Sequence, residues 1–167
     1  TIGMAQRGGN VVSHVRMGDA GEEVFAPLLA KGTADLVIAF EPAEGARVLP
    51  YLTPGGTLVT AQSAIQPVTA ALSNNPYRAQ SVVRALQQSF DAVPQASLVT
   101  VDDAALCQQV GSRKVLNVLL LASALNTGCL PLGVDDLRDA VRTCVKPRFV
   151  DLNLRAIEAA LAAKPTA

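Results

Sequence analysis

Residues 35–61, DLVIAFEPAEGARVLPYLTPGGTLVTA, carry the pattern from which the fold class follows. The run Asp35–Phe40 is apolar after its first residue, which is typical of a strand that helices cover on both faces. Pro42 can open a short helix, and Thr57–Ala61 repeats the apolar strand pattern after a turn at Pro54-Gly55-Gly56. A strand, a helix and a strand with short connections predict a right-handed parallel crossover.

The chain after this stretch repeats the alternation of helix and strand. Apolar residues at helical spacing predict a helix from Arg78 to Ala92, and Ser97–Val101 has the composition of a third strand. Asp102 is a suitable N-cap for the next helix, which we expect to close at Gly111. The two crossovers together indicate an α/β domain with a mostly parallel sheet.

Three further helices are predicted in the last third of the chain. Val115–Leu125 is apolar on all sides, which is typical of a helix buried in a core or against another chain. Asp135 and Asp136 open the next helix, where carboxylates suit the positive end of the helix dipole. Pro147 precedes the last helix. Because no linker divides the sequence, residues 1–167 are expected to form one domain.

The charge balance and the cysteines limit the kinds of partner and ligand. The 14 basic and 14 acidic side chains cancel, which argues against nucleic acid, because neutralising phosphates requires a basic excess. No apolar run has the length of a membrane span. Cys107, Cys129 and Cys144 lack the spacing of a metal site, so we expect buried, reduced thiols in a cytoplasmic protein. Low charge and the lack of tryptophan suggest a surface partly covered by another subunit.

The most distinctive stretch of the sequence is residues 3–17, GMAQRGGNVVSHVRM. It holds the only histidine of the chain together with two arginines. Gly8 and Gly9 allow a loop to bring its backbone close to a partner. The valines that follow predict a strand over residues 11–17, so the stretch is expected to be a functional loop that feeds a strand.

Alternation along that strand places His14 and Arg16 on one face and Ser13 on the other. A turn at residues 18–22 and a returning extended segment at residues 24–29 are expected to follow. His14 and Arg16 are then candidates for a shared site. The alternative interpretation is a structural histidine beside a solvated arginine.

The sequence shows no signature of catalysis that the chain could perform by itself. Neither glycine motif of nucleotide-binding loops occurs, and a single histidine without a marked nucleophile does not indicate a hydrolase. The acidic pairs at residues 22–23, 102–103 and 135–136 fall at turns or helix starts, where capping and solvation explain them. Glu41 lies at the carboxyl end of a strand, where open α/β sheets bind ligands, although a turn-stabilising or interface role is favoured.

Several strings of the sequence resemble one protein family in the same order along the chain. These strings are Gly3–Gly9 with Val12–Arg16, Asp35–Pro42 with Ala46–Tyr51 and Pro54–Thr57, then Val115–Leu121, and last Asn153–Ala156. Together they resemble the gamma subunit or domain of the 2-oxoacid:ferredoxin oxidoreductases, and in particular the beta subunit of the indolepyruvate ferredoxin oxidoreductase type. The first string is the most specific, and the others support it mainly through their order.

The resemblance implies a Rossmann-like three-layer α/β sandwich within a complex. Such complexes convert a 2-oxoacid, here expected to be an arylpyruvate such as indolepyruvate, and coenzyme A to an acyl-CoA and carbon dioxide while they reduce ferredoxin. In the family, thiamine diphosphate with magnesium performs the decarboxylation and iron–sulfur clusters carry the electrons, mainly on other subunits or domains. We therefore expect this chain to bind none of these groups alone, to be inactive alone, and to complete the assembly.

One part of the family pattern is not found in this sequence. Family members begin with a strand, a glycine-rich turn and a helix, and the first string recognised here follows those elements. A missing strand and helix are therefore expected, and a site that depends on that turn cannot be placed in this numbering.

The candidate residues face a ligand or another subunit, and no catalytic or metal-binding residue is expected in this chain. The candidates are Gln6, Arg7, Gly8, Gly9, Ser13, His14, Arg16 and Glu41. Two other functions stay open. One is a stand-alone module that binds an anionic small molecule such as coenzyme A through Arg7, Arg16 and the amides of Gly8-Gly9. The other is a purely structural oligomerisation domain.

Overall fold

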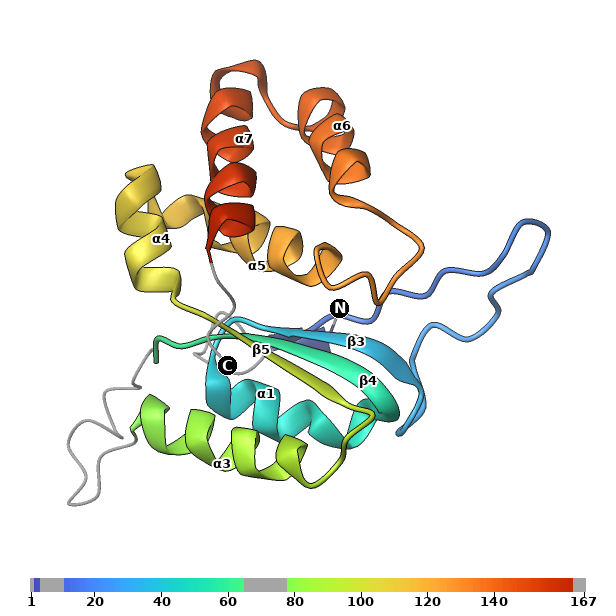
Figure 1. Cartoon of the computed structure of the whole chain (residues 1–167). Helices are drawn as coiled ribbons and strands as arrows, with labels where there is room; N and C mark the ends of the chain where they lie inside the picture. The colour runs from blue at the N-terminus through green and yellow to red at the C-terminus, as the bar shows by residue number, and fades with distance from the viewer. Residues whose placement is uncertain (1, 4–10, 65–77, 164–167) are drawn as a thin grey trace.

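The computed structural model describes residues 2–3, 11–64 and 78–163 of the chain (Figure 1). The regular elements follow the predicted alternation of strands and helices. In chain order they are β1 (Ile2–Gly3), β2 (Val11–Val12), β3 (Ala34–Ala39), α1 (Pro42–Val48), η2 (Leu49–Tyr51), β4 (Leu52–Ala61), α3 (Ala79–Asp91), β5 (Ser97–Val101), α4 (Asp103–Val110), η3 (Arg113–Val115), α5 (Leu116–Leu125), α6 (Val134–Cys144) and α7 (Pro147–Ala162).

The centre of the fold is a parallel sheet in the order β3-β4-β5. Val37 pairs with Leu58 of β4, and Leu58 pairs with Leu98 of β5, so β4 has a neighbour on each side. This position explains why the second half of β4 is buried throughout and why Leu58 and Val59 are 0% exposed. A separate antiparallel pair joins β1 to β2. The prediction of an α/β sandwich with a mostly parallel sheet is confirmed.

Helices cover both faces of the sheet and produce three layers (Figure 1). On one face α1 and α3 enclose a smaller core that contains Leu58, Leu86 and Phe90. On the other face α4, α5 and α7 enclose a larger core that includes Leu119 and Ile157, both fully buried. The all-round apolar helix predicted near residues 115–125 is α5, which contacts all three strands and α7. Helix α6 packs on α7, outside the layer next to the sheet.

The glycines near the start of β4 do not form the predicted turn. β4 begins at Leu52 and runs through residues 54–56. The register shifts there, because Ala34 is opposite Leu52 whereas Leu36 is opposite Thr57. The additional residues of β4 in this region therefore form an irregularity within the strand. Glycine favours such an irregularity for the same reason that it favours a turn, because it lacks a side chain.

The segment that follows β2 also departs from the prediction. The strand expected over residues 11–17 is limited to Val11–Val12, and residues 13–33 contain no helix or strand. The returning segment at 24–29 is not a strand either, although the turn at 18–22 is present, with the Glu22 amide donating to the Asp19 carbonyl at 2.8 Å. Within the described residues no strand lies beside residues 13–17, so their backbone has no ladder to join.

Candidate functional site

The carboxyl ends of the three parallel strands lie at the same edge of the sheet. β3 is followed by Glu41, β4 by Gln62 and β5 by Asp102. In open α/β sheets this edge is the usual place for ligands. The polar groups there are the first candidates for a site, and most of them are already engaged in local structure.

Glu41 is the N-cap of α1. Its Oε2 atom accepts a hydrogen bond from the Glu44 amide at 3.1 Å, and Pro42 occupies the first turn of the helix. Its Oε1 atom is enclosed and has no hydrogen-bond partner among the residues that the structure describes. One oxygen of this predicted candidate therefore stabilises the turn between β3 and α1, and the other remains an unused acceptor.

Asp103 joins the ends of β4 and β5 and is a residue that sequence reasoning missed. Its side chain is 1% exposed, and Oδ1 accepts hydrogen bonds from the amides of Gln62 at 3.1 Å and Ser63 at 2.9 Å. Its neighbour Asp102 caps α4, with Oδ1 accepting from the Ala105 amide at 3.0 Å. Capping explains Asp102 as predicted, but the expectation of a solvated charge is wrong for Asp103, because its side chain is buried and accepts hydrogen bonds from the amides of Gln62 and Ser63.

The surroundings of Asp103 also affect a thiol. The Arg113 guanidinium lies 4.0 Å from the other Asp103 oxygen, and Cys107 is buried one turn along α4. Burial raises the pKa of the Cys107 thiol, the Asp103 carboxylate raises it further, and Arg113 acts in the opposite direction. This thiol therefore stays protonated and unreactive, as is usual for a cysteine in a core.

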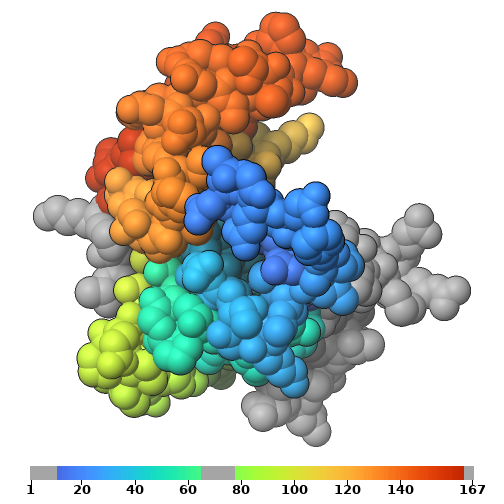
Figure 2. All heavy atoms as spheres, turned by 90° about the vertical axis from the view of Figure 1, so that its right-hand side faces the viewer, coloured from blue at the N-terminus to red at the C-terminus, as the bar shows by residue number. Residues whose placement is uncertain are grey.

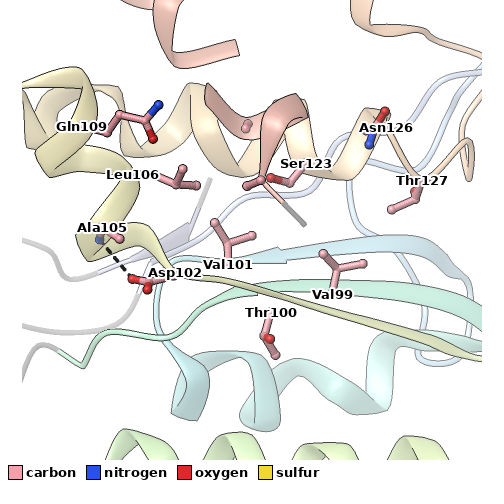
Figure 3. Close-up of a pocket in the computed structure, with 12 residues that line it drawn as sticks. Val99, Thr100, Val101, Asp102, Ala105, Leu106, Gln109, Ser123, Asn126 and Thr127 are labelled. Carbon is pink, nitrogen blue, oxygen red and sulfur yellow. Dashed lines mark hydrogen bonds between the residues drawn. The ribbon is translucent and has the colours of Figure 1, made fainter. Parts of the chain in front are cut away.

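A pocket of about 360 Å³ lies beside β5, between the sheet and the helices α4, α5 and α7 (Figure 3). Val99, Val101 and Leu106 point into it and make it mainly apolar, whereas Thr100 points to the other face of the sheet. The residues that line it are Val99, Thr100, Val101, Asp102, Ala105, Leu106, Gln109, Ser123, Asn126, Thr127, Ala160 and Ala163. Among the described residues that line it, the only charged group is the carboxylate of Asp102, so these residues offer no cation to an anionic ligand.

His14 and Arg16 connect the start of the segment 13–33, which has no helix or strand, to its returning part at residues 26–29. The Leu29 amide donates a hydrogen bond to His14 Nδ1 at 3.1 Å, and Arg16 Nη1 donates to the Ala26 carbonyl at 2.8 Å. The His14 ring also meets the Tyr51 ring edge-on, with centroids 5.6 Å apart and planes at 76°. Both side chains reach the same returning segment, and both contacts are structural. Ser13, between Val12 and His14, is exposed.

The remaining candidates from the sequence are Gln6, Arg7, Gly8 and Gly9. They lie outside the residues that the structure describes. The structure therefore brings together His14 and Arg16 through residues 26–29, and it places Glu41 at a separate position, the N-terminus of α1.

The described part of the chain contains no group of three His, Cys, Asp or Glu side chains arranged to hold a metal ion. The three cysteines are free thiols, but the expectation that all are buried is wrong, since Cys107 is buried, Cys129 is partly buried and Cys144 is exposed. No helix in the described ranges has both the length and the apolar character of a membrane span.

Comparison with known proteins identifies the family of this chain. The family described as "Pyruvate ferredoxin/flavodoxin oxidoreductase" matches residues 1–163. The chain is 33% identical over 160 residues to "Indolepyruvate oxidoreductase subunit IorB" of Archaeoglobus fulgidus, covering 95% of this chain and 75% of the relative. It is 29% identical over 157 residues to the protein of that name from Pyrococcus horikoshii, covering 93% and 74%. The chain belongs to the pyruvate ferredoxin/flavodoxin oxidoreductase family.

Proposed function

We propose that this chain is a non-catalytic subunit of a complex that oxidatively decarboxylates a 2-oxoacid to an acyl-CoA and reduces ferredoxin. The observation that carries the proposal is the match to the family over residues 1–163, together with relatives named as subunits of indolepyruvate oxidoreductase. Those names favour indolepyruvate, or another arylpyruvate, as the substrate of the complex.

The proposed division of labour puts thiamine diphosphate, magnesium, the iron–sulfur clusters and coenzyme A on a partner subunit or domain. The residues of this chain support that arrangement. An iron–sulfur cluster needs several cysteine thiolates at one place, whereas Cys107, Cys129 and Cys144 occur on different elements, at α4, after α5 and at the end of α6. Among the described residues, no three His, Cys, Asp or Glu side chains are grouped so that they could hold a metal ion. No step of the reaction is therefore assigned to a side chain of this chain.

Residues 1–167 would act in this complex as one gamma-type domain. Support comes from the parallel sheet and from the larger core, which joins β4 and β5 to α4, α5, α6 and α7 without a break. A domain held together in this way can present a rigid surface to a partner, and the assembled complex, not the single chain, would react with ferredoxin.

The alternative function, a stand-alone module for an anion such as coenzyme A, has weaker support. Of its proposed cationic groups, Arg16 donates to the Ala26 carbonyl, and Arg7 lies outside the described residues. The described residues that line the pocket beside β5 present a carboxylate and no cation. An anionic ligand would meet unfavourable electrostatics there.

Co-purification distinguishes the two functions. The complete polypeptide, tagged and expressed from its own host, should isolate with a second protein that contains thiamine diphosphate and iron, identified by mass spectrometry and by cofactor analysis. Isolation of the chain alone, together with micromolar binding of coenzyme A by calorimetry, would contradict the subunit proposal and support the alternative.

A further inference from the structure

We propose that residues 13–28, which we call the arm, insert into an apolar groove on the partner subunit, and that lysine or arginine side chains border this groove. The inference rests on the proposed function, because it assigns the surface through which this chain would join its complex.

The arm exposes an unusual number of large apolar side chains for its length. Phe25 is 84% exposed, Val15 is 73% exposed and Met17 is 59% exposed, and Val24 and Leu28 are also exposed. Single exposed apolar residues are common on protein surfaces, but five within sixteen positions are a higher density than such scattered residues produce. Exposed aromatic and methionine side chains on a small feature are typical anchors of protein interfaces.

The shape of the arm indicates what it fits. In Figure 1 the arm runs out from the body as a narrow loop, and in Figure 2 it stands in front of the sheet and the helices. A projecting element buries its side chains only if the partner is concave. The contacts of His14 with Leu29 and of Arg16 with Ala26 fasten its two sides, so the loop is preorganised and loses less entropy on binding.

The charge of the arm indicates which charge the border of the partner's groove should carry. Asp19, Glu22 and Glu23 lie at or beside its turn and are all exposed, whereas no lysine or arginine occurs between Met17 and Ala30. The Glu22 carboxylate accepts a bond from the Asp19 amide, which holds one of these charges in place. Against these three carboxylates the arm holds one cation, Arg16, which donates to the Ala26 carbonyl, so the remaining excess of negative charge favours a basic border on the partner.

A second copy of this chain fits these requirements poorly. The pocket beside β5 is an apolar hollow on this chain, and the charged group among its described lining residues is the Asp102 carboxylate. An acidic arm entering it would place like charges together. A different protein with a basic border is therefore the favoured occupant.

The test is site-specific photo-crosslinking in the co-purified complex. A benzophenone amino acid replaces Phe25 in one sample and Phe149 of α7, an exposed phenylalanine outside the arm, in a control sample. We expect irradiation to join position 25, but not position 149, to a peptide of the thiamine diphosphate-containing subunit. A crosslink from position 25 to another segment of the same polypeptide, or to a second copy, would overturn the inference.

The affinity of arm variants for the partner subunit tests the same inference quantitatively. We expect Phe25→Ser to weaken association with the partner at least tenfold, and Glu22→Lys combined with Glu23→Lys to slow association, while Phe149→Ser leaves both unchanged. Thermal unfolding of each variant should match the parent chain, because Phe25, Glu22 and Glu23 belong to neither core.

Unchanged affinity of Phe25→Ser would show that the arm is not part of the interface, while the subunit proposal would stand. Failure of the unmodified chain to bind any such partner would overturn the subunit proposal and, with it, this inference.

Discussion

The backbone amide of Leu29 donates a hydrogen bond to Nδ1 of His14 at 3.1 Å. This contact makes the only histidine of the chain a structural anchor for the arm. It also assigns the ring proton of the neutral histidine to Nε2, since Nδ1 is the acceptor.

Replacing His14 should release the Leu29 amide. A neutral hydrogen bond contributes about 0.5–1.5 kcal/mol, so we expect His14→Ala to increase hydrogen exchange at Leu29 by about two- to thirteenfold. Asparagine can present an acceptor near the position of Nδ1, and His14→Asn should preserve part of the protection. NMR-detected exchange measures both variants, with the Leu119 amide of α5 as an internal control. Equal exchange at Leu29 in His14→Ala and the parent chain would contradict the anchoring role.

Adjacent glycines at the start of β4 should respond differently to alanine. A Cβ atom at Gly56 would lie 2.6 Å from Leu52 Cδ1 and 3.0 Å from the Ala34 carbonyl oxygen. Gly56→Ala should therefore lower the free energy of unfolding by about 1–3 kcal/mol. The nearest atom to a Cβ at Gly55 is the Gln95 carbonyl at 3.9 Å, so Gly55→Ala should change stability by less than about 0.5 kcal/mol. Urea unfolding compares the pair, and equal losses would show that the strand irregularity is not as tightly packed as the structure indicates.

Replacing the buried Asp103 should lower the free energy of unfolding far more than replacing an exposed aspartate. Removing its carboxylate in Asp103→Ala leaves the Ser63 amide without this acceptor. We expect a loss of about 1.5–3 kcal/mol, the range for hydrogen bonds to a charged group. Asp103→Asn keeps an oxygen acceptor and should lose less, and Asp151→Ala, at an exposed site on α7, serves as the control. If Asp103→Ala were as stable as the Asp151→Ala control in denaturant titrations, the carboxylate would not connect β4 to β5.

The cysteines should react with alkylating reagents in order of exposure. Cys144 is exposed and Cys107 is buried with a raised pKa, so iodoacetamide at pH 8 should modify Cys144 first and Cys107 last. Mass spectrometry of peptides sampled over time gives the rates. All three thiols should react at similar rates after unfolding in urea. Modification of Cys107 at the rate of Cys144 in the folded chain would contradict the burial of α4 against the core.

The sequence predicted the elements whose signals are local. Apolar runs identified β3, the second half of β4 and β5, and Asp102 and Gly111 marked the ends of α4 through capping and a left-handed backbone with φ of 83°. The start of β4 was predicted as a turn, because Pro54-Gly55-Gly56 has the same composition in a turn and in a strand irregularity. Only pairing with β3 distinguishes the two.

The candidate site was less predictable because its contacts join distant residues. Asp103 resembles half of a solvated acidic pair until the amides of Gln62 and Ser63 are placed beside it. His14 and Arg16 were expected to face the same way, but sequence alternation could not show that their partners are the backbone of Leu29 and Ala26. The exposed phenylalanine of the arm had no sequence signal beyond its apolar character. The proposed roles of Gln6, Arg7, Gly8 and Gly9 stay predictions.

Reconstitution of turnover tests whether this chain is a required subunit of the oxidoreductase complex. The partner subunit is purified alone and is then mixed with the complete polypeptide, and ferredoxin reduction is followed with indolepyruvate and coenzyme A present. The subunit proposal predicts little reduction by either protein alone and a rate that rises with added chain until it saturates at a fixed stoichiometry. Full activity of the partner alone, unchanged by the added chain, would contradict it.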